Sequence, residues 1–214
     1  MKLLPFNACD YRCERCLVTG ECAVYQKTRE HLGKPRPDGG DGEDDLSAVL
    51  DDIRATFQET KEKIRAGAEE FGIDIDDIPA NYFEEEERKH EASMNDALFR
   101  RASDFTDQAR EFLKTIDSLL DEEGDSRSFY EDVNWHHTIV SAKTFRAVSG
   151  EGNEYLVEDV RNSAAVAVKS LTICSFALEE LASRFPDKAE ACGKLGGMAS
   201  SLKVDIRARW LLGQ

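Results

Sequence analysis

The sequence of 214 residues is long enough to bury a core without disulfides, as one domain with an appendage or as two small domains, and 33% of its residues are charged. Its net charge of −15 is uneven: residues 1–37 hold seven Lys or Arg against four acids, a formal +3, which leaves −18 on the rest and disfavours nucleic acid or an anionic membrane as a partner. No apolar stretch is long enough for a signal-peptide core or a membrane span, so we expect a cytoplasmic protein whose thiols stay reduced.

Four of the six cysteines lie close together near the start of the chain, in the pattern Cys9-x3-Cys13-x2-Cys16-x5-Cys22. Thiolates bind soft or borderline metals, and four of them match the coordination number of tetrahedral zinc or of a cubane iron–sulfur cluster. The surrounding residues contain little aromatic mass, so metal binding would contribute much of the folding free energy. We therefore predict a cysteine-rich metal-binding module at residues 1–32.

Residues 33–45 combine proline, glycine and acidic residues without apolar side chains, a composition typical of a linker. After the linker, residues 46–214 are predicted to be helical, because apolar residues recur at spacings of three and four. The stripes predict helices at 46–71, 82–122, 129–148 and 154–185, and a fifth that Asp187 caps. The sequence thus predicts an all-α fold, an antiparallel helical bundle of about five helices with a small N-terminal module.

The cysteine spacing resembles half of a bacterial-type [4Fe–4S] ferredoxin motif. Cys13-x2-Cys16 is followed by Cys22-Ala-Val-Tyr, and in ferredoxin-like subunits of heterodisulfide-reductase-type proteins the last cysteine often precedes Pro-Val-Tyr. Here Ala23 replaces that proline, the preceding gap is longer, and the second half of the motif is missing. The resemblance covers about fifteen residues and implies a cubane cluster. The ligands that it implies are Cys9, Cys13, Cys16 and Cys22.

Zinc is the alternative to an iron–sulfur cluster. Zinc ribbons separate two cysteine pairs by about a dozen residues or more, and that separation is absent here. Compact zinc knuckles fit four ligands into such a length, but they usually include a histidine, and His31 is the nearest one after Cys22. Ligand type and spacing therefore leave the identity of the metal open.

The spacing Cys9-x3-Cys13-x2-Cys16 is also similar to the cluster signature of radical S-adenosylmethionine enzymes. That resemblance implies a β/α barrel and a cluster with one open iron, and an all-helical chain with a fourth cysteine nearby departs from both. Arg12 and Arg15 are interleaved between the predicted ligands. Their charge would stabilise the dianionic centre that four thiolates form with either metal.

The other cysteines and the histidines have mainly structural interpretations. Cys174 and Cys192 lie on apolar helix stripes, where a cysteine is usually a small buried hydrophobe. His137 also falls on such a stripe and is expected to be buried and hydrogen-bonded, while His136 and His137 together are a possible secondary metal site. The Glu-x-x-His motif that ends at His90 lacks the second copy that a ferritin-like di-iron site needs.

No nucleophile elbow, phosphate loop, dinucleotide fingerprint or HExxH motif occurs, so catalysis stays open and no catalytic residue is predicted. We hypothesise an iron–sulfur protein that serves a protein partner, for example a redox enzyme, as an electron-transfer accessory or redox sensor, with the acidic helices as its docking surface. The alternative is a zinc-stapled interaction or regulatory protein with no redox role. The sequence leaves the oligomeric state open.

Overall fold

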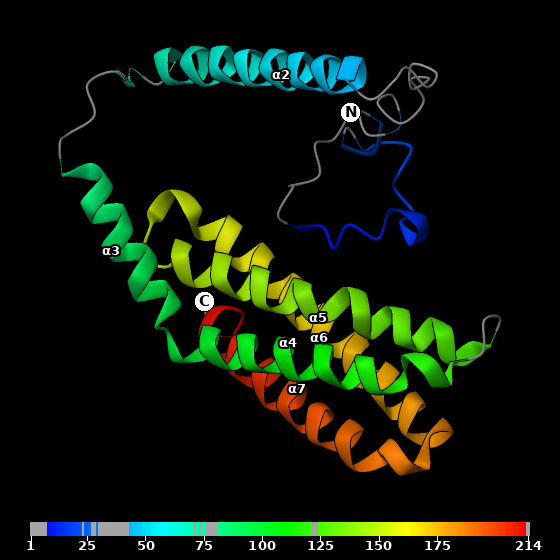
Figure 1. Cartoon of the computed structure of the whole chain (residues 1–214). Coiled ribbons are helices and arrows are strands. Elements are labelled where there is room, and N and C mark those ends of the chain that lie inside the picture. The colour runs from blue at the N-terminus through cyan, green and yellow to red at the C-terminus, as the bar shows by residue number, and fades with distance from the viewer. Residues whose placement is uncertain are drawn as a thin grey trace. The chain divides into compact units, whose positions relative to one another are not determined.

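The computed structural model describes residues 8–22, 24–26, 29, 43–70, 72, 74–75, 81–120 and 124–212. All regular structure in these residues is helical, which confirms the predicted all-α fold (Figure 1). The helices are α2 (Glu43–Glu70), α3 (Tyr82–Met94), α4 (Ala97–Ile116), α5 (Asp125–Gly150), α6 (Val157–Arg184) and α7 (Ala189–Trp210). Short 3-10 turns occupy Cys13–Arg15, Asp117–Leu119, Glu154–Leu156 and Pro186–Lys188.

The chain divides into two compact units. One contains Lys2–Cys16 and Glu87–Gln214, and the other contains Met1 and Leu17–Glu86. The boundary after Cys16 lies inside the predicted module of residues 1–32. Most of the predicted linker at residues 33–45 lies outside the described residues, and α2 begins at Glu43.

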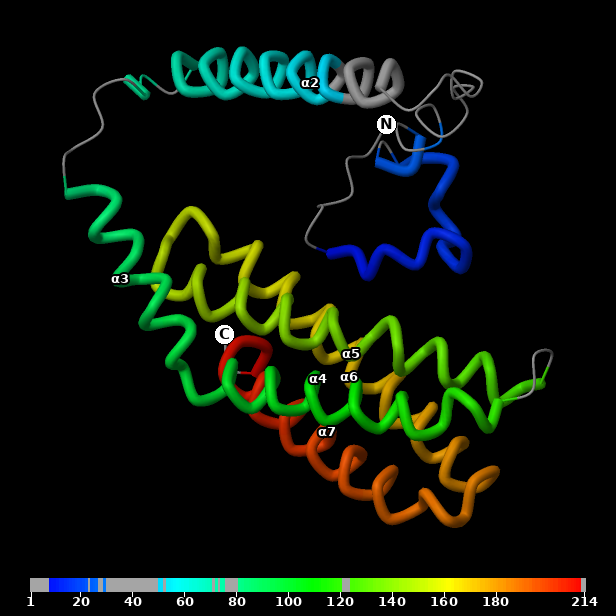
Figure 2. The backbone as a smooth tube through the Cα atoms, in the orientation of Figure 1, coloured from blue at the N-terminus to red at the C-terminus, as the bar shows by residue number. Residues whose placement is uncertain are grey.

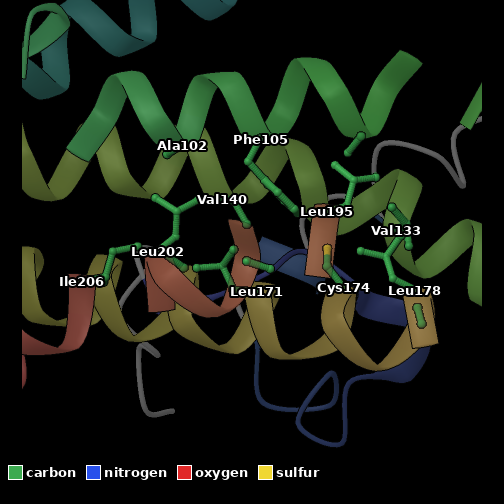
Figure 3. Packing of buried hydrophobic residues seen from close by; sticks show 14 of the residues in the cluster. Ala102, Phe105, Val133, Val140, Leu171, Cys174, Leu178, Leu195, Leu202 and Ile206 are labelled. Atoms are coloured by element: carbon green, nitrogen blue, oxygen red, sulfur yellow. The ribbon is translucent and has the colours of Figure 1, made fainter. Parts of the chain in front are cut away.

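Helices α4 to α7 pack as an antiparallel bundle in which α6 contacts both α5 and α7, and α4 contacts the same two helices (Figure 2). The predicted apolar stripes of these four helices supply the core, and their side chains interdigitate between the helices (Figure 3). The largest fully buried apolar side chains are Phe105, Ile116, Val133, Val140, Leu171, Leu178, Leu181, Leu202 and Ile206. Burial of a side chain of this size stabilises the fold by about 1.5–3 kcal/mol.

The prediction of one continuous helix over residues 82–122 is wrong. Helix α3 ends at Met94, and α4 begins at Ala97 after the N-cap residue Asp96. The Asp96 carboxylate accepts hydrogen bonds from the backbone N–H groups of Leu98, at 2.9 Å, and Phe99, at 3.1 Å. A side chain that bonds to two free N–H groups caps a new helix and stabilises it by about 1 kcal/mol. The spacing of apolar residues does not reveal such a cap.

The starts of two other helices also differ from the prediction. α5 begins at Asp125 after Gly124, without a side-chain cap, and not at residue 129. Asp187 lies inside the 3-10 turn before α7, whose N-cap is Lys188. A glycine follows the end of α2: Gly72 has a φ of 66°, and its N–H bonds to the Glu69 carbonyl at 3.1 Å.

Helix α2 differs from the bundle helices because the described part of its apolar stripe is exposed. The exposed fractions are 44% for Leu50, 46% for Ile53, 72% for Phe57 and 57% for Ile64. Among the helices described, none combines the length and the apolar character required to cross a membrane.

Candidate metal centre

Residues 8–16 form a tight loop that carries three of the four predicted ligands. The Tyr11 N–H donates a hydrogen bond to Cys9 Sγ at 3.2 Å, and the N–H of Cys13 donates to the Tyr11 carbonyl at 3.0 Å. The Cys16 N–H closes a further turn on the Cys13 carbonyl at 3.2 Å. Tyr11 has a φ of 59°, in the left-handed region. This conformation is unfavourable for a residue with a large side chain, and it persists only where the surrounding structure imposes it.

The Asp10 end of the loop is held on α5 and α6. The indole N–H of Trp135 donates to the Asp10 carbonyl oxygen at 2.7 Å, and Lys169 Nζ forms an ion pair with the Asp10 carboxylate at 2.5 Å. Burial alone would raise the pKa of Asp10, but the hydrogen bonds from Lys169 and from the Arg12 N–H hold it below its usual value. Asp10 is therefore a charged anchor at neutral pH.

The Cys16 end of the loop is held by Asp132 on α5. Arg15 Nη1 lies 2.5 Å from Asp132 Oδ1, and Arg12 Nη1 lies 3.6 Å from the same oxygen. Arg12 is only 8% exposed, since its guanidinium also stacks over the Trp135 ring at 5.6 Å and pairs with Glu14. The two arginines predicted to compensate a metal centre thus also anchor the loop to the bundle.

A buried lysine approaches the loop from α5. Lys143 is 5% exposed, and its Nζ lies 5.4 Å from the centroid of the Tyr11 ring. Burial and the charge of Arg146 lower the pKa of Lys143, while Cys9 acts in the opposite direction. Burial, followed by the nearby Cys9, raises the pKa of Tyr11.

The anchoring side chains point at the bundle, whereas the cysteines between them stay partly exposed. Cys9, Cys13 and Cys16 are reduced thiols of intermediate exposure. Their donor chemistry fits zinc or an iron–sulfur cluster. Within the part of the chain that the structure describes, however, no three Cys, His, Asp or Glu side chains are already arranged to hold a metal ion.

Cys22 belongs to the other compact unit. Its N–H bonds to the Thr19 carbonyl at 3.3 Å, and its carbonyl accepts the Gln26 N–H at 3.0 Å. The Gln26 side-chain amide also bonds to the Thr19 carbonyl, at 3.1 Å. Cys22 is thus a partly exposed thiol on a locally hydrogen-bonded turn. His31 lies outside the described residues.

Known proteins give no guide to this loop. Comparison of the chain with protein-family models, with curated proteins and with solved structures finds no match.

Cys174 and Cys192 confirm the structural interpretation of the two later cysteines. Cys174 is fully buried on α6, and Cys192 is 2% exposed on α7. Burial raises the pKa of Cys174 to about 12 and that of Cys192 to about 11. At neutral pH both are protonated thiols in an apolar environment, unsuited to metal binding or nucleophilic reactions.

His136 and His137 are both buried, and their side chains contact different parts of the bundle. His136 Nδ1 lies 3.1 Å from Ser170 Oγ on α6, whereas His137 Nδ1 lies 2.9 Å from the Val133 carbonyl of its own helix. Burial lowers the pKa of each imidazole. The prediction of a buried, hydrogen-bonded His137 is confirmed, and a metal site at the pair stays a prediction. His90 is exposed, with its ring 5.4 Å from that of Phe145.

Three residues of the loop's attachment escaped the sequence analysis as functional candidates. Asp132, Lys169 and Lys143 are ordinary charged residues on amphipathic helices, and no spacing rule links them to cysteines more than a hundred residues away. The only sequence feature near the attachment is that Trp135 directly precedes His136 and His137.

Proposed function

We propose that this chain binds a [4Fe–4S] cluster through Cys9, Cys13, Cys16 and Cys22, and that it transfers electrons to, or senses redox state for, a protein partner. The observation that carries the proposal is the loop of residues 8–16, which is fastened to the bundle by its non-cysteine side chains while its cysteines stay accessible. A loop with only a structural role would not need accessible cysteines between the side chains that attach it.

The chemistry of the loop supports thiolate ligation. Backbone N–H groups that bond to sulfur stabilise thiolates and tune cluster potentials, and the Tyr11 N–H already bonds to Cys9 Sγ at 3.2 Å. Among the described residues no three candidate ligands are arranged to hold a metal ion, so binding would have to order them. Part of the binding free energy is then used to order the loop, as in small metal-stapled units. Anchoring at Asp10, Arg12 and Arg15 reduces that cost, since less of the loop remains to be ordered.

Docking would use the acidic exterior. The net charge of −15 favours a partner with a basic surface, because complementary charge steers encounter and fixes orientation. A bound cluster beside the partly exposed Trp135 and the cysteine loop would lie near the protein surface. One electron could then pass between the cluster and a redox centre of the partner.

Zinc remains the second candidate, because the same thiolates suit it and the loop's attachment to α5 and α6 is what a structural staple would reinforce. In that case the metal would order the N-terminus, and the helices would recruit a partner without electron transfer.

Anaerobic purification of the full chain tests the proposal. If the chain binds one cubane cluster, it should contain about four irons and four sulfides. It should also show a broad absorption near about 400 nm that dithionite bleaches. A colourless protein with one tightly bound zinc per chain would contradict the redox proposal and support the staple. A chain that holds neither metal, after reconstitution with each, would contradict both.

The matched control separates the ligands from the other cysteines. Replacing Cys9, Cys13, Cys16 and Cys22 by serine should abolish binding of either metal, whereas Cys192→Ala should retain it. Equal metal contents in the two variants would show that the metal lies elsewhere.

A further inference from the structure

One carboxylate on α5 holds the two arginines that alternate with the cysteines. Asp132 Oδ1 lies 2.5 Å from Arg15 Nη1 and 3.6 Å from Arg12 Nη1. The Asp132 side chain is 13% exposed, and that of Arg12 is 9% exposed. The Arg12–Asp132 pair is therefore screened less by water than a surface pair. The shorter Arg15–Asp132 pair is more open to water, because the Arg15 side chain is 47% exposed.

The positions of the arginines decide what Asp132 controls. Arg12 precedes Cys13, and Arg15 precedes Cys16, so the carboxylate restrains the two backbone positions next to these cysteines. The opposite end of the loop has its own attachment, through the Trp135 bond to the Asp10 carbonyl at 2.7 Å and through Lys169. Loss of Asp132 should therefore loosen the Cys16 end of the loop, where Arg12 still stacks on Trp135 and Arg15 Nη2 still lies 3.4 Å from Ser128 Oγ. The Asp10 end should stay attached.

We infer that Asp132 is a positioning residue for the metal centre: it holds Cys13 and Cys16 against α5 and so slows release of the bound metal. The inference rests on the proposed function, since it concerns two of the same four thiols. Asp132 acts through Arg12 and Arg15, in the way that outer residues orient metal ligands elsewhere.

The first test uses the metal-free protein and the variant Asp132→Asn, which keeps the side chain's size and removes its charge. Alkylation by iodoacetamide, followed by peptide mass spectrometry, gives a rate for each cysteine. Cys13 and Cys16 should react several-fold faster in the variant, and Cys9 should change less. The control is Asp205→Asn, which removes an ion pair of similar length, 2.6 Å to Arg101, between α7 and α4. It should leave all the loop rates unchanged.

The second test uses the loaded protein. Loss of an outer residue usually lowers metal affinity by about 10–100-fold. Because Asp132 is inferred to slow release, transfer of the metal to an excess of a chelator should be faster for Asp132→Asn by about this factor. Asp132→Glu should restore most of the slow release, because it can still pair with both arginines. Thermal unfolding of the bundle, followed by circular dichroism, should differ little between Asp132→Asn and Asp205→Asn.

The outcomes separate the two proposals. If the wild-type protein takes up no metal, the proposed function fails, and the alkylation rates still decide whether Asp132 holds the loop. If the wild-type protein binds metal but Asp132→Asn changes neither rate, the positioning role is overturned. Should Asp132→Asn fail to fold, Arg15→Gln removes one arm of the same contact at a more exposed position and must show the same pattern.

Discussion

The loop of residues 8–16 and the core of the bundle both contain cysteines, and the two regions treat the same side chain in opposite ways. In the loop, Cys9, Cys13 and Cys16 are partly exposed, and Cys9 Sγ accepts a backbone hydrogen bond. In the core, Cys174 is fully buried among apolar side chains, and its pKa is raised to about 12. Environment, rather than residue type, therefore separates candidate ligands from packing residues in this chain.

Thiol reactivity should show this difference most strongly. In the metal-free native protein, Cys9, Cys13 and Cys16 should react with a thiol reagent at pH 8 within minutes. Cys174 should react at least about a thousandfold more slowly, because exposing it requires opening a core whose stability is on the order of 5–15 kcal/mol. The measurement is site-resolved alkylation, with the urea-unfolded chain as the reference for full reactivity. Comparable native rates for Cys174 and Cys13 would remove the contrast.

Metal content should follow the same division. The double variant Cys13→Ser/Cys16→Ser should lose nearly all bound iron or zinc, because a site with two thiolates left retains neither a cubane nor a tetrahedral zinc firmly. Cys174→Ala is the matched control and should keep the wild-type metal content per folded chain. Metal analysis after gel filtration gives both values, and a double variant that keeps its metal would place the ligands outside the loop.

The fold was predictable because it depends on periodicity. The apolar stripes of α4 and α6 were visible in the sequence, and residues such as Phe105, Leu171 and Leu178 are buried as the stripes require. The break at Asp96 was not predictable from the stripe, since it depends on one side chain that caps the next helix. The spacing of apolar residues is a property of many positions, whereas a cap is a property of one.

The site was predictable only in part. The spacing of the cysteines identified the loop as a candidate site, because residues on a short segment lie near one another. The residues that hold the loop come from α5 and α6, and sequence spacing carries no information on such distant contacts. Asp132 and Lys169 could be found only once the helices were packed, and the side-chain positions of Arg12 and Arg15 followed from Asp132.

Stability gives a smaller contrast between the same regions. Cys174→Ser places a hydroxyl where the structure offers an apolar environment, and should lower the free energy of unfolding by about 1–3 kcal/mol. Cys16→Ser in the metal-free protein should change it by less than about 0.5 kcal/mol, because Cys16 is partly exposed. Urea unfolding of the two variants, at one pH and salt concentration, tests the difference. Equal losses would mean that the loop belongs to the cooperative core.

The smallest expected effect concerns protons in the core. Burial lowers the pKa of His137 from the usual 6.5, so the native state favours the neutral imidazole more than the unfolded chain does. The stability that depends on neutral His137 is therefore complete above pH 6.5, and it declines as the pH falls below that value, because the unfolded chain then binds the extra proton.

Once the pH is well below the His137 pKa of both the folded and the unfolded chain, the free energy of unfolding should have fallen by about 1 kcal/mol for each unit by which folding lowers that pKa. His137→Gln should be less stable than the wild type at pH 7.5, since it disturbs the bond to the Val133 carbonyl, yet it should lose less on acidification to pH 5. His136→Gln serves as the comparison at the loop side of α5, where the charges of Asp10 and Asp132 oppose the effect of burial. If His137→Gln follows the wild type's decline with pH unchanged, the acid sensitivity arises outside this part of the core.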